Sequence, residues 1–207
     1  MRVRRAYALL GVMFIIIGIG AVLAFNQSFI KRGDTGNITS VSEPMTFSLI
    51  SSAFQHEGTI PKNYTCDGNK GLNPPLEITD VPAGTKSLVL IMDDPDVPKE
   101  VRPDGVFDHW VLFNIAPPAP QSSLEIFEGG PLPGTPGKNG RGENSYTGPC
   151  PPPQYEPREH RYIFAAYALD TELALAAGAS KSEVLAEIEG HVLGEAQLIG
   201  RYRRPPS

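Results

Sequence analysis

Short apolar runs bounded by glycine and proline are the feature that most constrains how this 207-residue chain can fold. Runs of this kind, rich in β-branched and aromatic residues, are typical of strands, and the turn-forming residues between them end each strand. Five runs stand out, at residues 45–50, 87–92, 106–115, 162–169 and 195–202. Many strands with little helix predict a mostly β protein built from antiparallel pairs.

One helix is clearly indicated, and it begins near residue 180. Ser180 is a typical N-cap, and Glu183 three residues later completes a capping box. Val184, Leu185 and Ile188 follow at the spacing of one apolar helix face. We therefore expect a single helix that packs on the predicted sheet.

Composition limits the class of protein. The hydrophobic fraction of 41% is ordinary for one globular domain. The formal net charge is -5, and no cluster of Lys or Arg occurs in the body of the chain, which argues against a nucleic-acid partner. Many of the 21 glycines and 21 prolines lie between residues 117 and 157, where we expect a long ordered loop.

The first 25 residues form a separate region. Arg2, Arg4 and Arg5 precede an uncharged apolar stretch at residues 6–25, long enough to cross a bilayer as a helix with the arginines on the cytoplasmic side. A cleaved signal peptide is the alternative, since residues 22–24 resemble a cleavage site. Either interpretation exports the rest of the chain, with residues 26–44 as a flexible stalk and residues 45–207 as the folded domain.

Side chains that can bind ligands lie at or beside the edges of the apolar runs. Four motifs carry them: Asp94-Pro95-Asp96-Val97-Pro98, Asp108-His109-Trp110, Gly148-Pro149-Cys150-Pro151-Pro152 and His160-Arg161-Tyr162. We expect the two histidines to enter adjacent strands and an aspartate to end a third, so that all converge on one solvent-accessible pocket. Strand alternation further predicts that His109, Val111 and Phe113 share one sheet face.

These four motifs, in this order, resemble the phosphatidylethanolamine-binding protein family, also called Raf kinase inhibitor-like proteins, in a bacterial or archaeal form. The resemblance extends over about residues 45–202. It implies a large central antiparallel sheet with a smaller sheet on one side and a helix on the other. It also implies that Asp94, His109 and His160 line a pocket for an anionic ligand such as a phosphate ester or a phospholipid head group.

Other pocket residues follow from the same resemblance. It assigns Gly148, Pro149 and Pro151 to the pocket rim and favours Tyr162 as a further pocket residue. Asp96 is interpreted as part of a turn, because aspartate beside proline is ordinary turn chemistry.

The two cysteines, Cys66 and Cys150, are the only ones in the chain. The family brings their loops to the same end of the sheet, and export places them in an oxidising compartment, so we expect a disulfide. A pair of buried free thiols is the alternative.

Three functions are compatible with the motifs. The first is an exported, membrane-tethered module that binds a small anion or lipid head group, without enzymatic activity, cofactor or metal. The second is an inhibitor of an envelope or extracellular serine protease, since relatives are described as inhibitors. The third, a hydrolase, would use Asp94 with His109 or His160 as acid and base. Neither histidine has metal-chelating spacing, and Ser145 and Cys150 are the only nucleophiles near the motifs.

Overall fold

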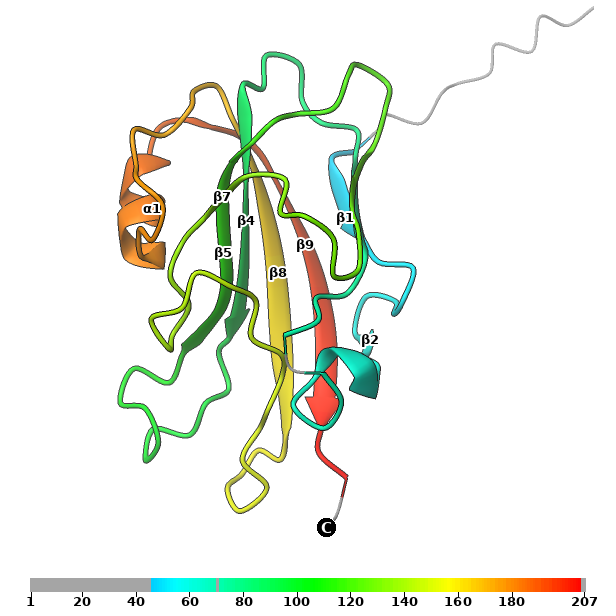
Figure 1. Cartoon of the computed structure of the whole chain (residues 1–207), viewed down its shortest axis with the longest axis vertical. Helices are drawn as coiled ribbons and strands as arrows, with labels where there is room; N and C mark the ends of the chain where they lie inside the picture. The colour runs from blue at the N-terminus through cyan, green and yellow to red at the C-terminus, as the bar shows by residue number, and fades with distance from the viewer. Residues whose placement is uncertain (1–45, 70, 206–207) are drawn as a thin grey trace, which may run out of the picture. The chain divides into compact units, whose positions relative to one another are not determined.

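The computed structural model describes residues 46–69 and 71–205, and this part of the chain forms two β-sheets (Figure 1). The smaller sheet has the order β1-β3-β6, and the larger has the order β2-β9-β8-β4-β5-β7. All pairs are antiparallel except β2 with β9. The smaller sheet contains β1 (Ser48–Ile50), β3 (Leu76–Thr79) and β6 (Leu124–Ile126). The larger contains β2 (Gly58–Thr59), β4 (Ser87–Asp94), β5 (Phe107–Ile115), β7 (Thr135–Pro136), β8 (Glu159–Leu169) and β9 (Val192–Arg203).

The predicted mostly β fold is confirmed, and each of the five predicted runs coincides with all or part of a strand. The sequence pattern missed β2, β3, β6 and β7, which have two to four residues each. Such strands are too short to show an alternating pattern. Two of them, β6 and β7, interrupt the segment expected to be loop.

Helix α1 (Lys181–Glu187) begins as its sequence predicts. The Ser180 side chain accepts a hydrogen bond from the Glu183 backbone N–H, and the Glu183 carboxylate accepts one from the Ser180 backbone N–H. The described chain also contains a short 3-10 helix, η1 (Lys62–Tyr64), between β2 and β3. No helix within the described part of the chain has the length and apolar character needed to span a bilayer. The predicted N-terminal anchor and stalk fall on residues 1–44, outside the described residues.

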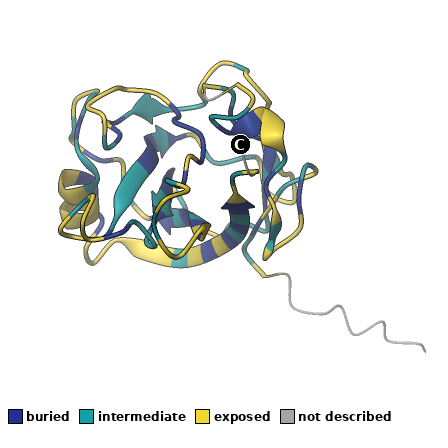
Figure 2. Ribbon diagram, turned by 90° about the horizontal axis from the view of Figure 1, so that it is seen from below, coloured by how far each residue is buried: buried dark blue, intermediate teal, exposed yellow. Residues whose placement is uncertain are grey.

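The central strands of the larger sheet are buried on both faces, with the small sheet on one side and α1 on the other (Figure 1). In β4, Leu88, Leu90 and Met92 belong to the core between the sheets, while Val89 and Ile91 belong to the core beneath α1. This two-sided burial explains why β4 is a continuous apolar run. By contrast, β9 alternates between buried and exposed residues over much of its length (Figure 2). Truncating a fully buried leucine of β4 to alanine should cost about 2 to 5 kcal/mol of stability.

A β-bulge in β5 changes the direction of His109. The register pairs Met92 with Trp110 but Asp93 with Asp108, so β5 carries one extra residue between the pairs. A bulge places two successive side chains on the same face. His109 therefore lies on the small-sheet side and contacts Tyr162 of that core. The expectation that simple alternation would group His109 with Val111 and Phe113 is wrong because of this extra residue.

Candidate ligand-binding site

Three strand ends of the larger sheet meet at one cavity. Asp94 ends β4, His109 lies near the start of β5, and His160 lies at the start of β8. The sequence predicted that the two histidines enter adjacent strands. This is wrong, because β4 lies between β5 and β8. The cavity has a volume of about 230 Å³. It is lined by Asp94, Val97, Val101, Phe107, His109, Arg141, Thr147, Gly148, Cys150, Pro152 and His160.

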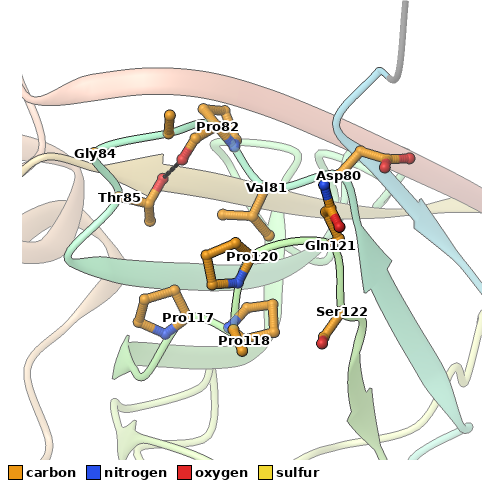
Figure 3. A pocket seen from close by; sticks show the side chains of 12 residues that line it. Asp80, Val81, Pro82, Gly84, Thr85, Pro117, Pro118, Pro120, Gln121 and Ser122 are labelled. Carbon is orange, nitrogen blue, oxygen red and sulfur yellow. Dashed lines mark hydrogen bonds between the residues drawn. The ribbon is translucent and has the colours of Figure 1, made fainter. Parts of the chain in front are cut away.

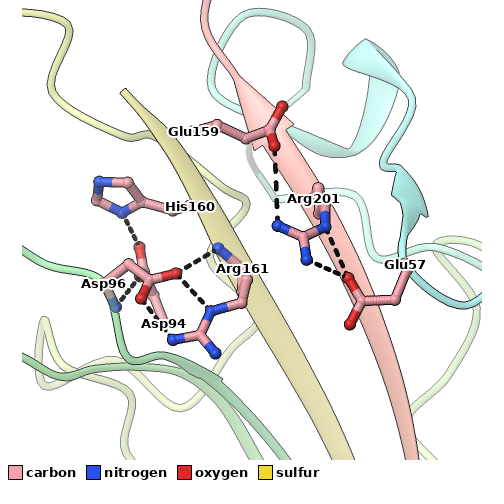
Figure 4. A network of polar contacts seen from close by, with 7 residues as sticks. All are labelled: Glu57, Asp94, Asp96, Glu159, His160, Arg161 and Arg201. Carbon is pink, nitrogen blue, oxygen red and sulfur yellow. Dashed lines mark hydrogen bonds and ion pairs between the residues drawn. The ribbon is translucent and has the colours of Figure 1, made fainter. Parts of the chain in front are cut away.

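Asp94 and His160 form a buried hydrogen-bonded pair (Figure 4). His160 Nδ1 lies 2.7 Å from Asp94 Oδ2. The other carboxylate oxygen accepts a hydrogen bond from the Asp96 backbone N–H at 2.9 Å. An ionised carboxylate only accepts, so His160 Nδ1 carries the hydrogen. His160 Nε2, on the far side of the ring, is buried and has no hydrogen-bond partner among the described residues.

His109 is held as a neutral hydrogen-bond acceptor. Its Nδ1 contacts the carbonyl oxygen of Thr147, which can only accept, so Nδ1 carries the hydrogen. Burial lowers the pKa of His109 to about 4. At neutral pH its Nε2 therefore offers a lone pair and cannot donate.

Tyr162 lies behind the two histidines rather than on the cavity wall. Its ring meets the His109 ring edge-on, with centroids 5.2 Å apart, and stacks near His160 at 6.5 Å. Burial raises the pKa of Tyr162, and the nearby Asp94 carboxylate adds to this, so the phenol stays protonated. Its hydroxyl has no hydrogen-bond partner within the described part of the chain. Tyr162 therefore supports the two histidine rings from behind. The resemblance favoured it as a pocket residue, but it does not line the cavity wall.

The proline-rich loop contributes to the cavity in a different register from the predicted one. Gly148 lines the wall as expected, whereas Cys150 and Pro152, rather than Pro149 and Pro151, line it beside Gly148. A side chain at Gly148 would collide with the backbone of Tyr64 and Thr65. The glycine is therefore required for the close approach of two chain segments.

A disulfide joins Cys66 and Cys150, whose Cα atoms lie 5.3 Å apart. Next to it, the Cys66 backbone N–H donates to the Pro149 carbonyl at 3.0 Å. The bond ties the proline-rich loop to the segment after η1 and thus fixes one wall of the cavity.

Asp96 has a larger role than the turn assigned to it. Its carboxylate accepts hydrogen bonds from the Arg161 backbone N–H and from two guanidinium nitrogens of the same residue, at 2.7 to 2.9 Å (Figure 4). The Arg161 guanidinium holds the pKa of Asp96 below its usual range. This bidentate contact links the turn after β4 to β8, and so fixes Asp94 relative to His160.

Sequence reasoning missed several wall residues. Val97, Val101 and Phe107 provide apolar surface, and Arg141 and Thr147 come from the loop between β7 and β8. Val97 lies within the first motif, and Val101 and Phe107 lie close to the motifs, so all three could have been included on proximity alone. Arg141 lies in a glycine-rich loop without periodicity, where no sequence signal marks it.

A larger cavity of about 560 Å³ lies at the opposite end of β4 and β5, between the loops at residues 80–85 and 117–122 (Figure 3). Proline and small side chains form most of its wall, and Asp80 is its one ionisable lining residue. The convergence of buried polar groups, rather than cavity size, therefore selects the site at Asp94. Across residues 46–69 and 71–205, no three His, Cys, Asp or Glu side chains are grouped so that they could hold a metal ion.

This two-sheet fold with a buried Asp–His pair at one sheet end identifies the class of protein. The chain belongs to the phosphatidylethanolamine-binding protein family, whose profile matches residues 50–203. A UPF0098 protein of Methanothermobacter thermautotrophicus is 48% identical over 159 residues, covering 76% of this chain and 99% of the relative. A UPF0098 protein of Pyrococcus horikoshii is 37% identical over 209 residues, covering 97% of each chain.

Solved structures agree with this assignment. A phosphatidylethanolamine-binding protein homologue from Chlamydia trachomatis is 42% identical, with a TM-score of 0.70 over 77% of this chain and 99% of that one. YbcL from E. coli, described as a member of the mammalian family, has a TM-score of 0.64 at 24% identity, over 78% and 100% of the two chains. This second likeness shows the fold alone.

Proposed function

We propose that the domain binds a small anionic ligand, such as a phosphate ester or a phospholipid head group, in the cavity at Asp94, His109 and His160. The proposal is carried by His160 Nε2, a buried nitrogen with no partner in the part of the chain that the structure describes. A buried polar atom left without a partner costs about 1 to 3 kcal/mol, and a ligand that satisfies it recovers that energy.

The chemistry of the wall restricts the ligand. A ligand that hydrogen-bonds to His160 Nε2 leaves the contact between His160 Nδ1 and Asp94 in place. The Gly148 backbone also lines the wall, where the absence of a side chain leaves room for a ligand. His109 Nε2 only accepts at neutral pH, so the ligand must itself donate one hydrogen bond.

Phosphoethanolamine meets these requirements. Its phosphate oxygens accept hydrogen bonds, and its ammonium group donates to His109 or Asp94. A phosphate monoester that keeps one P–OH group meets them too. A fully deprotonated anion without any donor leaves His109 unsatisfied.

The residues support a binding module rather than an enzyme. Cys150 is held in a disulfide and offers no thiolate. Ser145 is not among the residues that line the cavity. The Asp94–His160 pair could serve as an acid and a base, but the one hydroxyl among the wall residues, on Thr147, is hydrogen-bonded to Asn139 and not to His160.

Export and membrane attachment are part of the same proposal. The Cys66–Cys150 disulfide supports export, because disulfides persist mainly in oxidising compartments. The apolar segment at residues 6–25 is the proposed anchor. Its cleavage is tested by sequencing the N-terminus of the protein recovered from a bacterial host.

Calorimetric titration of the full-length protein with phosphoethanolamine tests the proposal. The wild type should bind, and His160→Gln should lose about 10-fold or more in affinity, since it removes a charge-assisted hydrogen bond. His191→Gln is the matched control, because His191 is half-exposed and paired with Asp170 outside the cavity. Equal affinity in wild type and His160→Gln contradicts the assignment. No binding by the wild type favours the inhibitor of a serine protease instead.

A further inference from the structure

The loop at residues 139–147 is fastened to β5 at the bulge that directs His109 into the cavity. Near one end of the loop, the Gly140 backbone N–H donates to the Asp108 carbonyl at 2.7 Å. At the other end, the Thr147 backbone N–H donates to the His109 carbonyl at 3.0 Å. The two ends therefore bind consecutive residues of β5.

One buried side chain, Asn139, cross-links this loop. Asn139 is 5% exposed. Its Oδ1 accepts hydrogen bonds from the backbone N–H groups of Arg141 and Glu143, at 2.9 and 3.1 Å. Its Nδ2 donates to the Ser145 carbonyl at 2.9 Å and to the Thr147 hydroxyl at 3.0 Å. Both acceptor positions and both N–H groups of the amide are used, so the side chain has one fixed orientation.

Thr147 is held on both sides of its carbonyl group. Asn139 binds its hydroxyl, and its N–H donates to His109. The next residue, Gly148, lies so close to the Tyr64 backbone that no Cβ would fit there. The Thr147 carbonyl therefore has little freedom to turn away from His109 Nδ1, with which it makes its own hydrogen bond.

The Thr147 carbonyl determines what His109 offers to a ligand. A carbonyl oxygen only accepts, so it selects the tautomer of His109 with the hydrogen on Nδ1. Nε2 then carries a lone pair, and burial, which lowers the pKa of His109 to about 4, keeps the ring neutral at neutral pH. An imidazole without this contact can populate both tautomers, and its Nε2 would then donate part of the time.

We propose that Asn139 is a positioning residue that sets the ligand specificity of the site. By holding Thr147, it keeps the hydrogen of His109 on Nδ1, and the site then selects ligands that donate a hydrogen bond to Nε2. Asn139 does not itself line the cavity. The inference rests on the proposed function and adds to it a residue behind the wall that determines which ligands are preferred.

The tautomer of His109 is measured first, on the full-length protein without ligand at about pH 7.5. Nitrogen NMR of isotope-labelled histidine separates protonated from unprotonated ring nitrogens, and the His109 signals are those missing in His109→Gln. The wild type should show a protonated Nδ1 and an unprotonated Nε2. In Asn139→Ala both signals should move toward those of a mixture of tautomers. The His160 signals should stay in place, because Asp94 holds that ring.

Two variants of Thr147 isolate its contact with Asn139. Thr147→Val removes the hydroxyl but keeps the shape and the carbonyl, so its His109 signals should move in the same direction as in Asn139→Ala. Thr147→Ser keeps the hydroxyl and should retain the wild-type signals. Asn144→Ala is the matched control, since Asn144 lies in the same loop but is exposed and does not line the cavity. Thermal unfolding shows whether each variant is folded, and Thr147→Val decides the question if Asn139→Ala is not.

Calorimetry then measures ligand preference with two probes that differ by one amino group, phosphoethanolamine and ethyl phosphate. At about pH 7.5 both phosphates are almost fully deprotonated, because the second pKa of a phosphate ester is about 6, so only phosphoethanolamine carries a donor. The wild type should prefer phosphoethanolamine. Asn139→Ala should reduce this preference at least about 3-fold, since it weakens a charge-assisted hydrogen bond, whereas Asn144→Ala should keep it.

The inference requires both results. Wild-type tautomer signals in Asn139→Ala and Thr147→Val would overturn it, and so would an unchanged preference despite shifted signals. If the wild type binds both probes equally, His109 does not select the ligand and the inference fails, while the proposed binding site stands. If the wild type binds neither probe, the proposed function fails, and the tautomer signals alone decide whether Asn139 positions His109.

Discussion

Two polar clusters lie back to back at the same end of the large sheet, and they differ in which atom each leaves without a partner. On the face toward the small sheet, Asp94, His109 and His160 leave a buried imidazole nitrogen, His160 Nε2, without a partner among the described residues. On the face toward α1, Lys181 Nζ bridges Asp93 Oδ2 and Asp108 Oδ1, at 2.8 and 3.0 Å, and the atom left without a described partner is a carboxylate oxygen, Asp93 Oδ1. Asp93 and Asp94 are neighbours in β4, as are Asp108 and His109 in β5, whereas His160 belongs to β8 and Lys181 to α1.

The difference shows which cluster is structural. Burial lowers the pKa of Lys181, but its hydrogen bonds with Asp93 and Asp108 outweigh burial and leave the pKa raised. Burial also raises the pKa of Asp93, and Lys181 offsets this only in part. A lysine with both carboxylates in reach fastens α1 to the sheet and leaves no cation for a ligand. On the opposite face, His160 lines a cavity that a ligand can enter, whereas Asp93 lines neither that cavity nor the larger one at the other end of β4.

The largest change in stability is expected from the disulfide, which belongs to the pocket face alone. Replacing Cys66 and Cys150 together by serine should lower the free energy of unfolding by up to about 4 kcal/mol, because the bond closes a loop with a sequence separation of 84. Ligand affinity should fall as well, since the bond fixes one wall. Urea unfolding and calorimetry measure the two effects. A loss of stability below about 1 kcal/mol would contradict the prediction.

The next effect depends on pH and comes from His109. The unfolded chain binds a proton on this residue below about pH 6.5, and the folded protein only below about pH 4. Stability is therefore lost as pH falls from about 6.5 to 4, by up to about 3 kcal/mol. His109→Gln should lack this component, so the difference between its unfolding free energy and that of the wild type should vary with pH in this window. If the unfolding free energies of the two proteins changed with pH in the same way, the lowered pKa of His109 would be contradicted.

Breaking the cluster on the helix face should affect stability and spare the site. Lys181→Met leaves two half-buried carboxylates without their cation and should cost about 2 kcal/mol. Because Lys181 lies on the other side of the sheet, the affinity for phosphoethanolamine should stay within about 2-fold of the wild type. Chemical unfolding measures the loss of stability, and calorimetry on the same preparation measures the affinity. An equal loss of affinity would mean that the two faces are coupled.

The smallest change in stability is expected at Asp96 and Arg161. Arg161 is about half-exposed, so Arg161→Gln should cost at most about 1 kcal/mol. Affinity should nevertheless fall a few-fold, because the contact fixes the turn that carries Asp94 relative to His160. Arg158→Gln, which removes an exposed arginine that is paired with Glu156 and does not line the cavity, is the control. Unchanged affinity in Arg161→Gln would show that the contact between Asp96 and Arg161 does not position Asp94 for binding.

The sequence predicted the fold in outline because its long strands and its one helix carry strong local signals. The capping box at Ser180 and the continuous apolar run of β4 are both patterns of residues close together in the chain. Strands of two to four residues depend on distant partners, and no local pattern marks them. The family resemblance, more than periodicity, brought Asp94 and the two histidines together.

The details of the site depended on tertiary structure. The proton position on His109 follows from the Thr147 carbonyl, which lies 38 residues away in the chain. The order of contacts in the proline run depends on the disulfide and on the fit of Gly148 against Tyr64. Arg141 reaches the cavity through a loop organised by Asn139. None of these relations is visible in a single sequence.

The extra residue in β5 makes the identity of the site a matter of counting along the strand. Deleting His109, the one residue between Asp108 and Trp110, would restore regular pairing and leave a single side chain where His109 and Trp110 now share a face. Asp108 would stay opposite Asp93 and keep its contact with Lys181, while the pocket would lose its histidine. The extra residue thus supplies a side chain to the pocket, whereas the cluster on the other face of the sheet does not depend on it.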